Sequence, residues 1–460
     1  MELMQRIKEF ALNSVLAVLV ILSFVLSYQV WFPSHTGGPW RTREAHVQSS
    51  PPPQSGGEPD VHRPERIYVQ NKEGQVALLV TGSPGYGTVW NGLKGVLKGL
   101  EPLYSQLPPD GEDEGPVESI TAVLPVPLML NQWAQEWAWD PGGLPNASLK
   151  VDRVTVTLSK TPMLHLSGAN GGVYRVGPLS ATDQHLLTGL VGALDPGLYR
   201  TYRPLEAKDL AVKLTPGLSV PDIVEMPVGA VTARQPDATV EQARYFPDLS
   251  VVRHIEERDA NSFTDGPRWL RLKQNGQIEY VTAPPVGVPP DLLRAREAAK
   301  AWVPAHGGWS QDLALGGYFQ QQAGRALLVY DLRLYGNGYP VETASPEPGD
   351  GALVLELTNL DQTTTVLQYR RDPEFTPLFT DSLIPIQPAE KVLAAAAERY
   401  PTLFLLEGEV REMYLGYLIW QPDKLTTWKL IPVWITQVGE KRIYWPASQL
   451  GEMDPFVAGI

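Results

Sequence analysis

An uncharged, mostly apolar run near the start of the chain, residues 10–32, constrains the molecule more than any other feature of the sequence. A helix rises about 1.5 Å per residue, so a run of this length can cross a hydrocarbon core about 30 Å thick. A helix also satisfies its own backbone hydrogen bonds, as lipid requires. We therefore expect residues 10–32 to form a transmembrane helix that anchors the protein.

A cleaved signal peptide is the alternative interpretation, because the run is N-terminal and follows the basic residues Arg6 and Lys8. Residues 28–32 favour an uncleaved helix, since they are bulky and lack the small residues that a signal peptidase recognises. The two basic residues favour a cytoplasmic stub over residues 1–9. The expected location is the cell membrane, as a single-pass protein with a cytoplasmic N-terminus and an extracytoplasmic C-terminal bulk.

Composition limits the chemistry of the extracytoplasmic part. The chain has no cysteine, so disulfides and thiolate-metal sites are excluded. The seven histidines are scattered; His254 precedes Glu256 and Glu257 as in half a zinc motif, but the second histidine is missing. The formal net charge of −13 disfavours nucleic acid as a partner. We predict no metal site, no cofactor site and no catalytic residue.

A change of composition marks the first domain boundary. Residues 33–65 are rich in proline, glycine and serine and contain few apolar residues, as flexible linkers do. The remaining chain is longer than one hydrophobic core normally serves. We expect a larger N-terminal α+β domain over residues 66–285, a central α+β domain over residues 286–372 and a C-terminal α+β domain over residues 373–460.

Local patterns support this α+β class. Residues 66–81 predict two strands joined by a turn, residues 151–158 alternate as a strand does, and residues 181–194 are typical of a helix. Residues 268–281 predict a hairpin, in which alternating residues flank Asn275-Gly276. This pair is a favoured two-residue turn, because both positions tolerate positive φ.

The central and C-terminal domains resemble one another. In each, a helix opens after a proline, Pro290 or Pro388, which suits a first helical position. Strands follow in both, including one that ends in a Pro-Val pair, at residues 340–341 and 432–433. The pattern predicts a repeated unit of one helix on a small antiparallel sheet. Two unrelated α+β segments are the alternative.

One stretch of the N-terminal domain carries a family resemblance. Residues 245–280 read YFPDLSVVRHIEERDANSFTDGPRWLRLKQNGQIEY. This succession is similar to the signature of the YycH family, membrane-anchored regulators of the YycG/YycF (WalK/WalR) two-component system. The matching residues are Phe246, Pro247, Asp248, Val252, Arg253, Ile255, Thr264, Asp265, Gly266, Arg268, Leu270, Glu279 and Tyr280.

The resemblance implies a non-catalytic function in signal transduction. Such proteins regulate a sensor histidine kinase that controls cell-wall homeostasis, act with a sister protein, YycI, and contact the kinase through transmembrane helices. The implied partners are a histidine kinase of WalK/YycG type, a YycI-type protein and the membrane. Outside the signature, the resemblance lies in the layout: a short stub, one span and two C-terminal α+β units.

Small and polar residues line one side of the expected span. Ser23 and Ser27 lie about one helical turn apart, with Ala17 and Val20 on about the same side and Asn13 near the cytoplasmic end. Small residues let a second helix approach closely, and polar ones hydrogen-bond across such a contact. We predict that this side binds the partner helix; an inert anchor that merely tolerates these residues is the alternative.

Two other function classes stay open. An anchored extracytoplasmic cell-wall hydrolase would use Asp265, Glu256 or Glu279 as acids, in a deep cleft with at least two convergent carboxylates. A wall-binding module would need its span only as a tether. The classes differ in what they require of residues 10–32, because only regulation depends on the sequence of this span.

Overall fold

The computed structural model describes residues 63–459 except for short gaps at 101–103, 107–116, 132–133, 135–136, 138, 140–149, 169–172, 206–211, 216–217, 284, 286, 310–312, 322, 344–350, 362, 422–427, 440 and 449–452. The described residues belong to one compact unit. Among them, no helix is both long and apolar enough to cross a membrane. The expected span lies outside the described residues, as do its predicted partner-binding residues Asn13, Ala17, Val20, Ser23 and Ser27.

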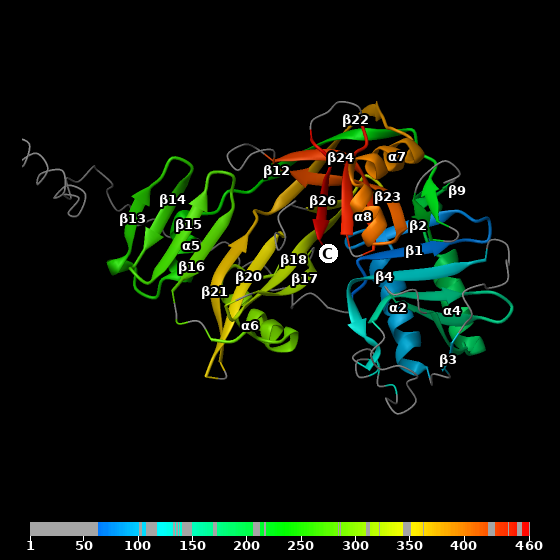
Figure 1. The fold of residues 1–460 in the computed structure, drawn as a ribbon, viewed down its shortest axis with the longest axis horizontal. Coiled ribbons are helices and arrows are strands. Elements are labelled where there is room, and N and C mark those ends of the chain that lie inside the picture. Colours follow the sequence, from blue (N-terminus) through cyan, green and yellow to red (C-terminus); the bar gives the residue numbers. More distant parts are fainter. Residues whose placement is uncertain are drawn as a thin grey trace, which may run out of the picture. The chain divides into compact units, whose positions relative to one another are not determined.

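The first sheet has eight strands and is built from residues 66–200 (Figure 1). In spatial order its strands are β3 (Tyr104–Gln106), β7 (Val173–Pro178), β6 (Met163–Gly168), β5 (Lys150–Thr157), β4 (Ser119–Met129), β1 (Arg66–Gln70), β2 (Val76–Val80) and β8 (Tyr199–Arg200). α2 (Tyr86–Gly99) and α4 (Ala181–Gly192) pack against each other. They bury their apolar sides in the core that these strands share.

The second sheet has fourteen strands, most of which belong to three antiparallel meanders. The first meander is β13 (Arg253–Glu256), β14 (Ala260–Thr264), β15 (Arg268–Lys273) and β16 (Ile278–Thr282). The second is β17 (Leu313–Gln321), β18 (Arg325–Gly336), β20 (Leu353–Leu360) and β21 (Thr363–Arg371), and the third is β23 (Glu409–Trp420), β24 (Lys429–Val438), β25 (Lys441–Pro446) and β26 (Phe456–Gly459).

Two contacts between strands join the meanders into one sheet. β16 pairs directly with β21, so the first meander continues into the second. β19 (Tyr339–Thr343) pairs antiparallel with β18 and parallel with β23, which connects the second meander to the third. β10 (Lys213–Leu214) also pairs with β23. Outside this sheet, β12 (Glu225–Ala233) pairs with β22 (Phe375–Pro385), and β9 (Tyr202–Pro204) pairs with β11 (Ser219–Pro221).

Helices cover parts of the second sheet, and capping residues fix where they begin. They are α5 (Ala238–Tyr245), α6 (Leu292–Ala305), α7 (Ala389–Arg399) and α8 (Pro401–Leu406), with a 3-10 turn at η3 (Leu249–Val251). A second 3-10 turn, η2 (Pro196–Leu198), precedes β8 of the first sheet. The Asp237 side chain accepts hydrogen bonds from the first backbone amides of α5, and Asp291 does so for α6. Such caps satisfy amides that lack a partner within the helix.

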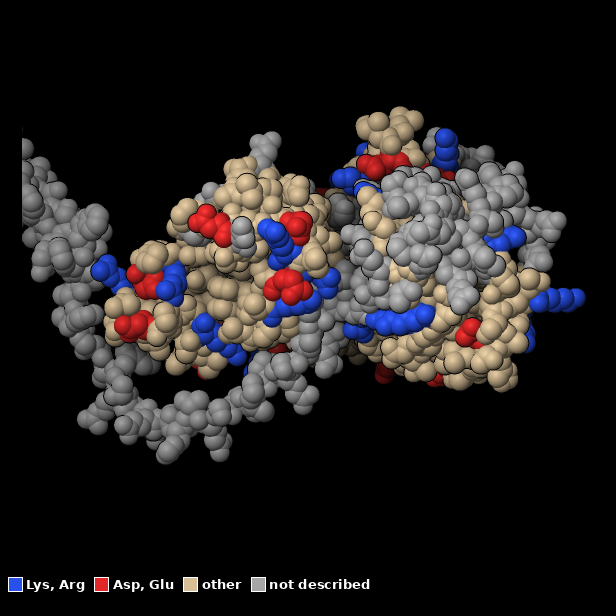
Figure 2. Space-filling view, turned by 90° about the horizontal axis from the view of Figure 1, so that it is seen from below, with Lys and Arg blue, Asp and Glu red and all other residues tan. Residues whose placement is uncertain are grey.

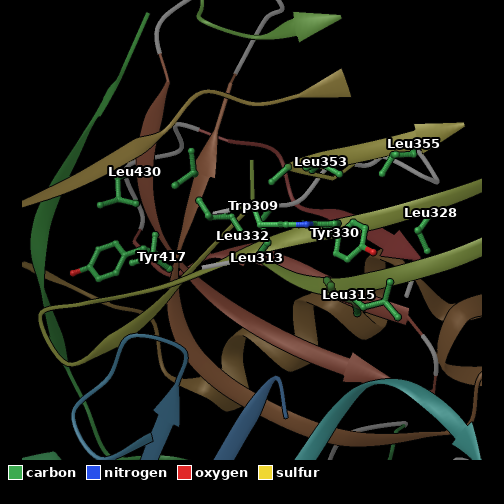
Figure 3. Packing of buried hydrophobic residues seen from close by; sticks show 14 of the residues in the cluster. Trp309, Leu313, Leu315, Leu328, Tyr330, Leu332, Leu353, Leu355, Tyr417 and Leu430 are labelled. Carbon is green, nitrogen blue, oxygen red and sulfur yellow. The ribbon is translucent and has the colours of Figure 1, made fainter. Parts of the chain in front are cut away.

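One hydrophobic core runs under the second sheet. Figure 3 shows Leu313 and Leu332 of the second meander close to Tyr417 and Leu430 of the third. α6 packs on β18 and β21, while α7 packs on β24 and β25. One helix thus packs on the second meander and another on the third, while residues 340–341 lie in the connecting strand β19 and residues 432–433 in the long strand β24.

Strand pairing does not mark the predicted domain boundaries as breaks. Strands on both sides of residue 285 pair where β16 meets β21, and β12 pairs with β22 across the same position. The core shown in Figure 3 likewise includes residues on both sides of residue 372. The described buried residues form one core over residues 67–194, a second over residues 205–443 and Ala447, and a smaller third one within residues 414–458.

The expected hairpin over residues 268–281 is present, but its turn differs from the prediction. β15 and β16 pair in register, yet of the two turn residues only Gly276 has positive φ, at 90°. The Gly276 amide donates to the Lys273 carbonyl (2.9 Å), and the Lys273 amide donates to the Gln277 carbonyl (2.9 Å). This is a three-residue loop whose glycine forms a bulge, the second common way to close a hairpin.

Candidate functional site

The signature stretch begins at Tyr245, the last residue of α5, and continues through η3 into the first meander. Phe246 follows α5 and is buried, and Tyr280 of β16 packs against Tyr245 of α5 with ring centroids 5.0 Å apart. Leu270 lies directly opposite Tyr280 and is also buried. These apolar signature residues therefore hold the helix against one face of the meander.

Most polar signature residues shape turns. The Asp248 side chain accepts hydrogen bonds from the amide and hydroxyl of Ser250 in η3. Thr264 donates to the carbonyl of Arg268 (2.7 Å), and Asp265 accepts from the amide of the same residue (3.0 Å). Gly266 lies between them with φ 104°, which glycine tolerates best. The Thr-Asp-Gly-x-Arg motif is thus the β14–β15 turn.

The other face of this meander is open and carries both apolar and charged side chains. Trp269 and Val281 lie opposite each other on β15 and β16 and are 37% and 41% exposed. Arg271 lies beside them and contacts Glu257 (2.6 Å), Asp259 (3.1 Å) and, at 3.7 Å, Glu279. In the view of Figure 2, basic and acidic side chains are intermingled on the surface of the described residues.

The structure does not bring the three candidate acids together. Asp265 accepts a backbone hydrogen bond within the β14–β15 turn, and Glu279 pairs with Lys273 on β15. Glu256 lies opposite Asn261 on the edge strand β13, on the face away from Glu279, since side chains alternate along strands. His254 hydrogen-bonds Asn261 and stacks on Phe263. Among the described residues no group of three or more metal-ligating side chains gathers.

A buried ionic network lies where the described chain begins, a feature that the sequence analysis missed. Arg66 of β1 is fully buried; its guanidinium contacts Glu412 of β23 (2.6 Å) and donates to the Tyr414 hydroxyl (2.6 Å). Glu65 contacts Arg66 (2.9 Å), Arg333 of β18 (2.9 Å) and Arg442. Two adjacent residues thus connect the first sheet to three strands of the second.

Glu342 completes the network from β19. Its carboxylate accepts hydrogen bonds from the hydroxyls of Tyr414 (2.9 Å) and Tyr444 (3.2 Å) and contacts Arg333 (3.4 Å). Arg153 of β5 contacts the remaining oxygen of Glu412. Acidic and basic groups therefore alternate through the network, as buried charges require.

The pKa shifts follow from this arrangement. Burial alone would raise the pKa of Glu65, but the charges of Arg442, Arg66 and Arg333 outweigh it and hold the pKa well below its ordinary value. Burial likewise opposes the ionised form of Glu412, yet Arg66 and Arg153 lower its pKa. Burial raises the pKa of Asp331, at the edge of the network. Glu65 and Glu412 are therefore ionised at neutral pH, and the network joins the two sheets through charge.

Sequence signals for this network exist, but they are weak. Glu412 and Arg442 each directly precede the apolar run of a strand, where a buried charge needs a partner. The partner cannot be identified from the sequence, because Glu65 and Arg442 are 377 positions apart.

Comparison with known proteins identifies the fold. No family model matches the sequence, and no curated protein matches it. Among solved structures, YycH from Bacillus subtilis matches 85% of this chain and 96% of its own length, with a TM-score of 0.52 and 12% sequence identity. A second match, an uncharacterized protein from Eubacterium rectale, has a TM-score of only 0.28 with 10% identity and supports no inference. The resemblance expected from residues 245–280 is therefore confirmed at the level of the fold: the described chain has the architecture of YycH.

Proposed function

We propose that this protein is a membrane-anchored, non-catalytic regulator of a sensor histidine kinase of WalK/YycG type, acting with a YycI-type sister protein. The observation that carries the proposal is the YycH-like fold, which extends over 85% of the chain. The signature-like residues 245–280 support it independently of the fold. The regulated process would be cell-wall homeostasis.

Regulation of this kind depends on a coupling free energy between binding of the span and the conformation of the kinase. A span that packs better against one conformation of the kinase's transmembrane bundle shifts the bundle's equilibrium by its differential affinity and by no more. The ionic network supports a role for the extracytoplasmic body, because it ties Glu65, the last residue of the expected linker, and Arg66, the first residue of β1, to the second sheet. A displacement of the second sheet would then also move Glu65 and Arg66, because separating their buried ion pairs is energetically costly.

Co-purification from membranes tests the proposal. We expect the full chain to retain a histidine kinase and a YycI-type protein, identified by mass spectrometry. A chain with residues 10–32 scrambled at constant composition should lose the kinase, because hydrophobicity is kept while the packing face is destroyed. Equal recovery of the kinase with both spans would contradict contact through the span.

A narrower prediction concerns the face of the span. Replacing Ser23 and Ser27 together by leucine should weaken recovery of the kinase, since bulky side chains hold the helices apart. Ser14→Leu is the matched control, because Ser14 lies nine positions before Ser23 and therefore about half a turn away around the helix at 3.6 residues per turn. Unchanged recovery with the double variant, or an equal loss with Ser14→Leu, would show that this face does not bind.

A further inference from the structure

β13 forms an open edge of the second sheet. It pairs with β14 on one side and is the last strand in the sheet order, so no described strand lies on its other side (Figure 1). All four of its residues, Arg253 to Glu256, are exposed. The strand has no proline, lysine or bulge, so of the devices that protect an edge from pairing with another chain it has only its short length and its charged residues Arg253 and Glu256.

The backbone groups that β13 leaves free can be assigned from its hairpin. The Glu257 amide donates to the Ala260 carbonyl (3.0 Å), which makes these two residues a hydrogen-bonded pair. Hydrogen-bonded and non-bonded pairs alternate along an antiparallel ladder, so Ile255 and Arg253 bond inward to β14. The N–H and C=O groups of His254 and Glu256 therefore point outward from the sheet edge.

We propose that β13 pairs with β13 of a second copy of this chain, antiparallel and about a twofold axis at Ile255. In this register His254 lies opposite Glu256 of the other copy, twice by symmetry, and both residues present the outward-facing backbone groups that a ladder needs. Ile255 meets its own copy at the axis. Arg253 lies opposite Glu257, so each cross-strand pair joins opposite charges, an imidazole and a carboxylate, or two apolar side chains.

Neighbouring registers lack this match. Two side chains that lie opposite each other in a ladder must be on the same face of the sheet. The twofold axis can therefore pass only through a residue, so the nearest alternative registers place it at His254 or at Glu256. An axis at His254 opposes His254 to itself and Arg253 to Ile255, which matches no charges. An axis at Glu256 opposes Glu256 to itself, and like charges directly opposite are unfavourable. The sequence of the strand therefore selects the axis at Ile255.

The residues before the strand extend the proposed interface. Leu249 and Val251 in η3 are 47% and 55% exposed, and Ile255 is 41% exposed. In this register Leu249 and Val251 lie four or more residues from the axis, beside the β13–β14 turn of the other copy. The area is small, so the dimer is expected to be weak and reversible. The inference concerns assembly only and does not depend on the proposed function.

Cysteine cross-linking tests the interface directly, because the native chain has no cysteine. In a non-hydrogen-bonded antiparallel pair the two Cα atoms lie about 4.5 Å apart, within the range of a disulfide. Full-length Ile255→Cys should form a disulfide-linked dimer in membranes under mild oxidation. Val281→Cys is the control: Val281 is equally exposed, at 41%, but lies on β16, inside the same meander. A dimer at position 255 alone supports the proposal.

Absence of a dimer with Ile255→Cys, or equal yields from the two variants, would overturn the interface. A charge-swap experiment tests the register within it. In the Ile255→Cys background, Glu256→Lys places lysine opposite His254 of the other copy, and His254→Glu places glutamate opposite Glu256. Each variant alone should cross-link about tenfold less, because two favourable pairs are replaced by two unfavourable ones.

Mixing the two charge variants should restore cross-linking. The mixed dimer has one His254·Glu256 pair and one Lys·Glu pair, whereas neither variant can form favourable pairs with itself. Different tags on the two copies would identify the mixed species on a gel. Restored cross-linking confined to the mixed dimer supports the twofold register at Ile255, and failure of the mixture to recover would overturn it.

Discussion

At the scale of single residues, the notable feature is a set of buried charged side chains, each of which is stabilised in its ionised form by a partner of opposite charge. Arg66, Arg333 and Arg442 are 0%, 3% and 4% exposed, and Glu65 and Glu342 are each 1% exposed. Each arginine contacts at least one of these carboxylates or Glu412. Removing one member would leave its partners charged, buried and unpaired.

Arg333→Met tests this reasoning. Methionine keeps most of the volume but leaves Glu65 and Glu342 short of one positive charge, so we expect the free energy of unfolding to fall by about 3–5 kcal/mol. Urea unfolding of the full chain, followed by tryptophan fluorescence, measures the loss. Arg234→Met is the control, since Arg234 and its partner Glu374 are 73% and 51% exposed and exposed pairs contribute less than about 1 kcal/mol. Similar losses in both variants would contradict the role assigned to burial.

At the scale of elements, the spacing of apolar residues predicts single helices, strands and hairpins. It does not predict which strands pair when they are far apart in the sequence. The two-strand pattern of residues 66–81, the helix within residues 181–194 and the hairpin within residues 268–281 are all present, because apolar spacing and turn residues determine them. The pairing of β12 with β22 was missed. Its partners are about 150 positions apart, and only tertiary packing brings them together. The same separation hid the ionic network, whereas the signature resemblance was found because its residues are contiguous.

Glycine substitutions test the turn assignment. Gly276 has φ 90°, and an added Cβ would meet Pro373 at 2.9 Å, so Gly276→Ala should destabilise the chain by about 1–2 kcal/mol. Gly95 lies inside α2 with nothing within 4 Å of an added Cβ, so Gly95→Ala should stabilise by about 0.5–1 kcal/mol. The opposite signs are measurable as urea midpoints that shift in opposite directions. A neutral Gly276→Ala would show that the loop adopts another conformation.

At the scale of the whole molecule, the pairing between distant strands makes the described chain a continuous body. The first meander joins the second through β16 and β21, and the second joins the third through β19. Charged contacts then tie β1, the first described strand, to β23 of the third meander. A body connected in this way can pass a displacement at one surface to the residues next to the linker, which is what the proposed regulatory function requires.

The most direct test of the account is the rate of kinase autophosphorylation in vesicles that contain the histidine kinase and this protein. If the protein regulates the kinase through its span, the full chain changes the rate, in either direction. A chain with an unrelated span in place of residues 10–32, but with the same residues 33–460, then leaves the rate at that of the kinase alone. An equal change of rate with the unrelated span would contradict regulation through the span.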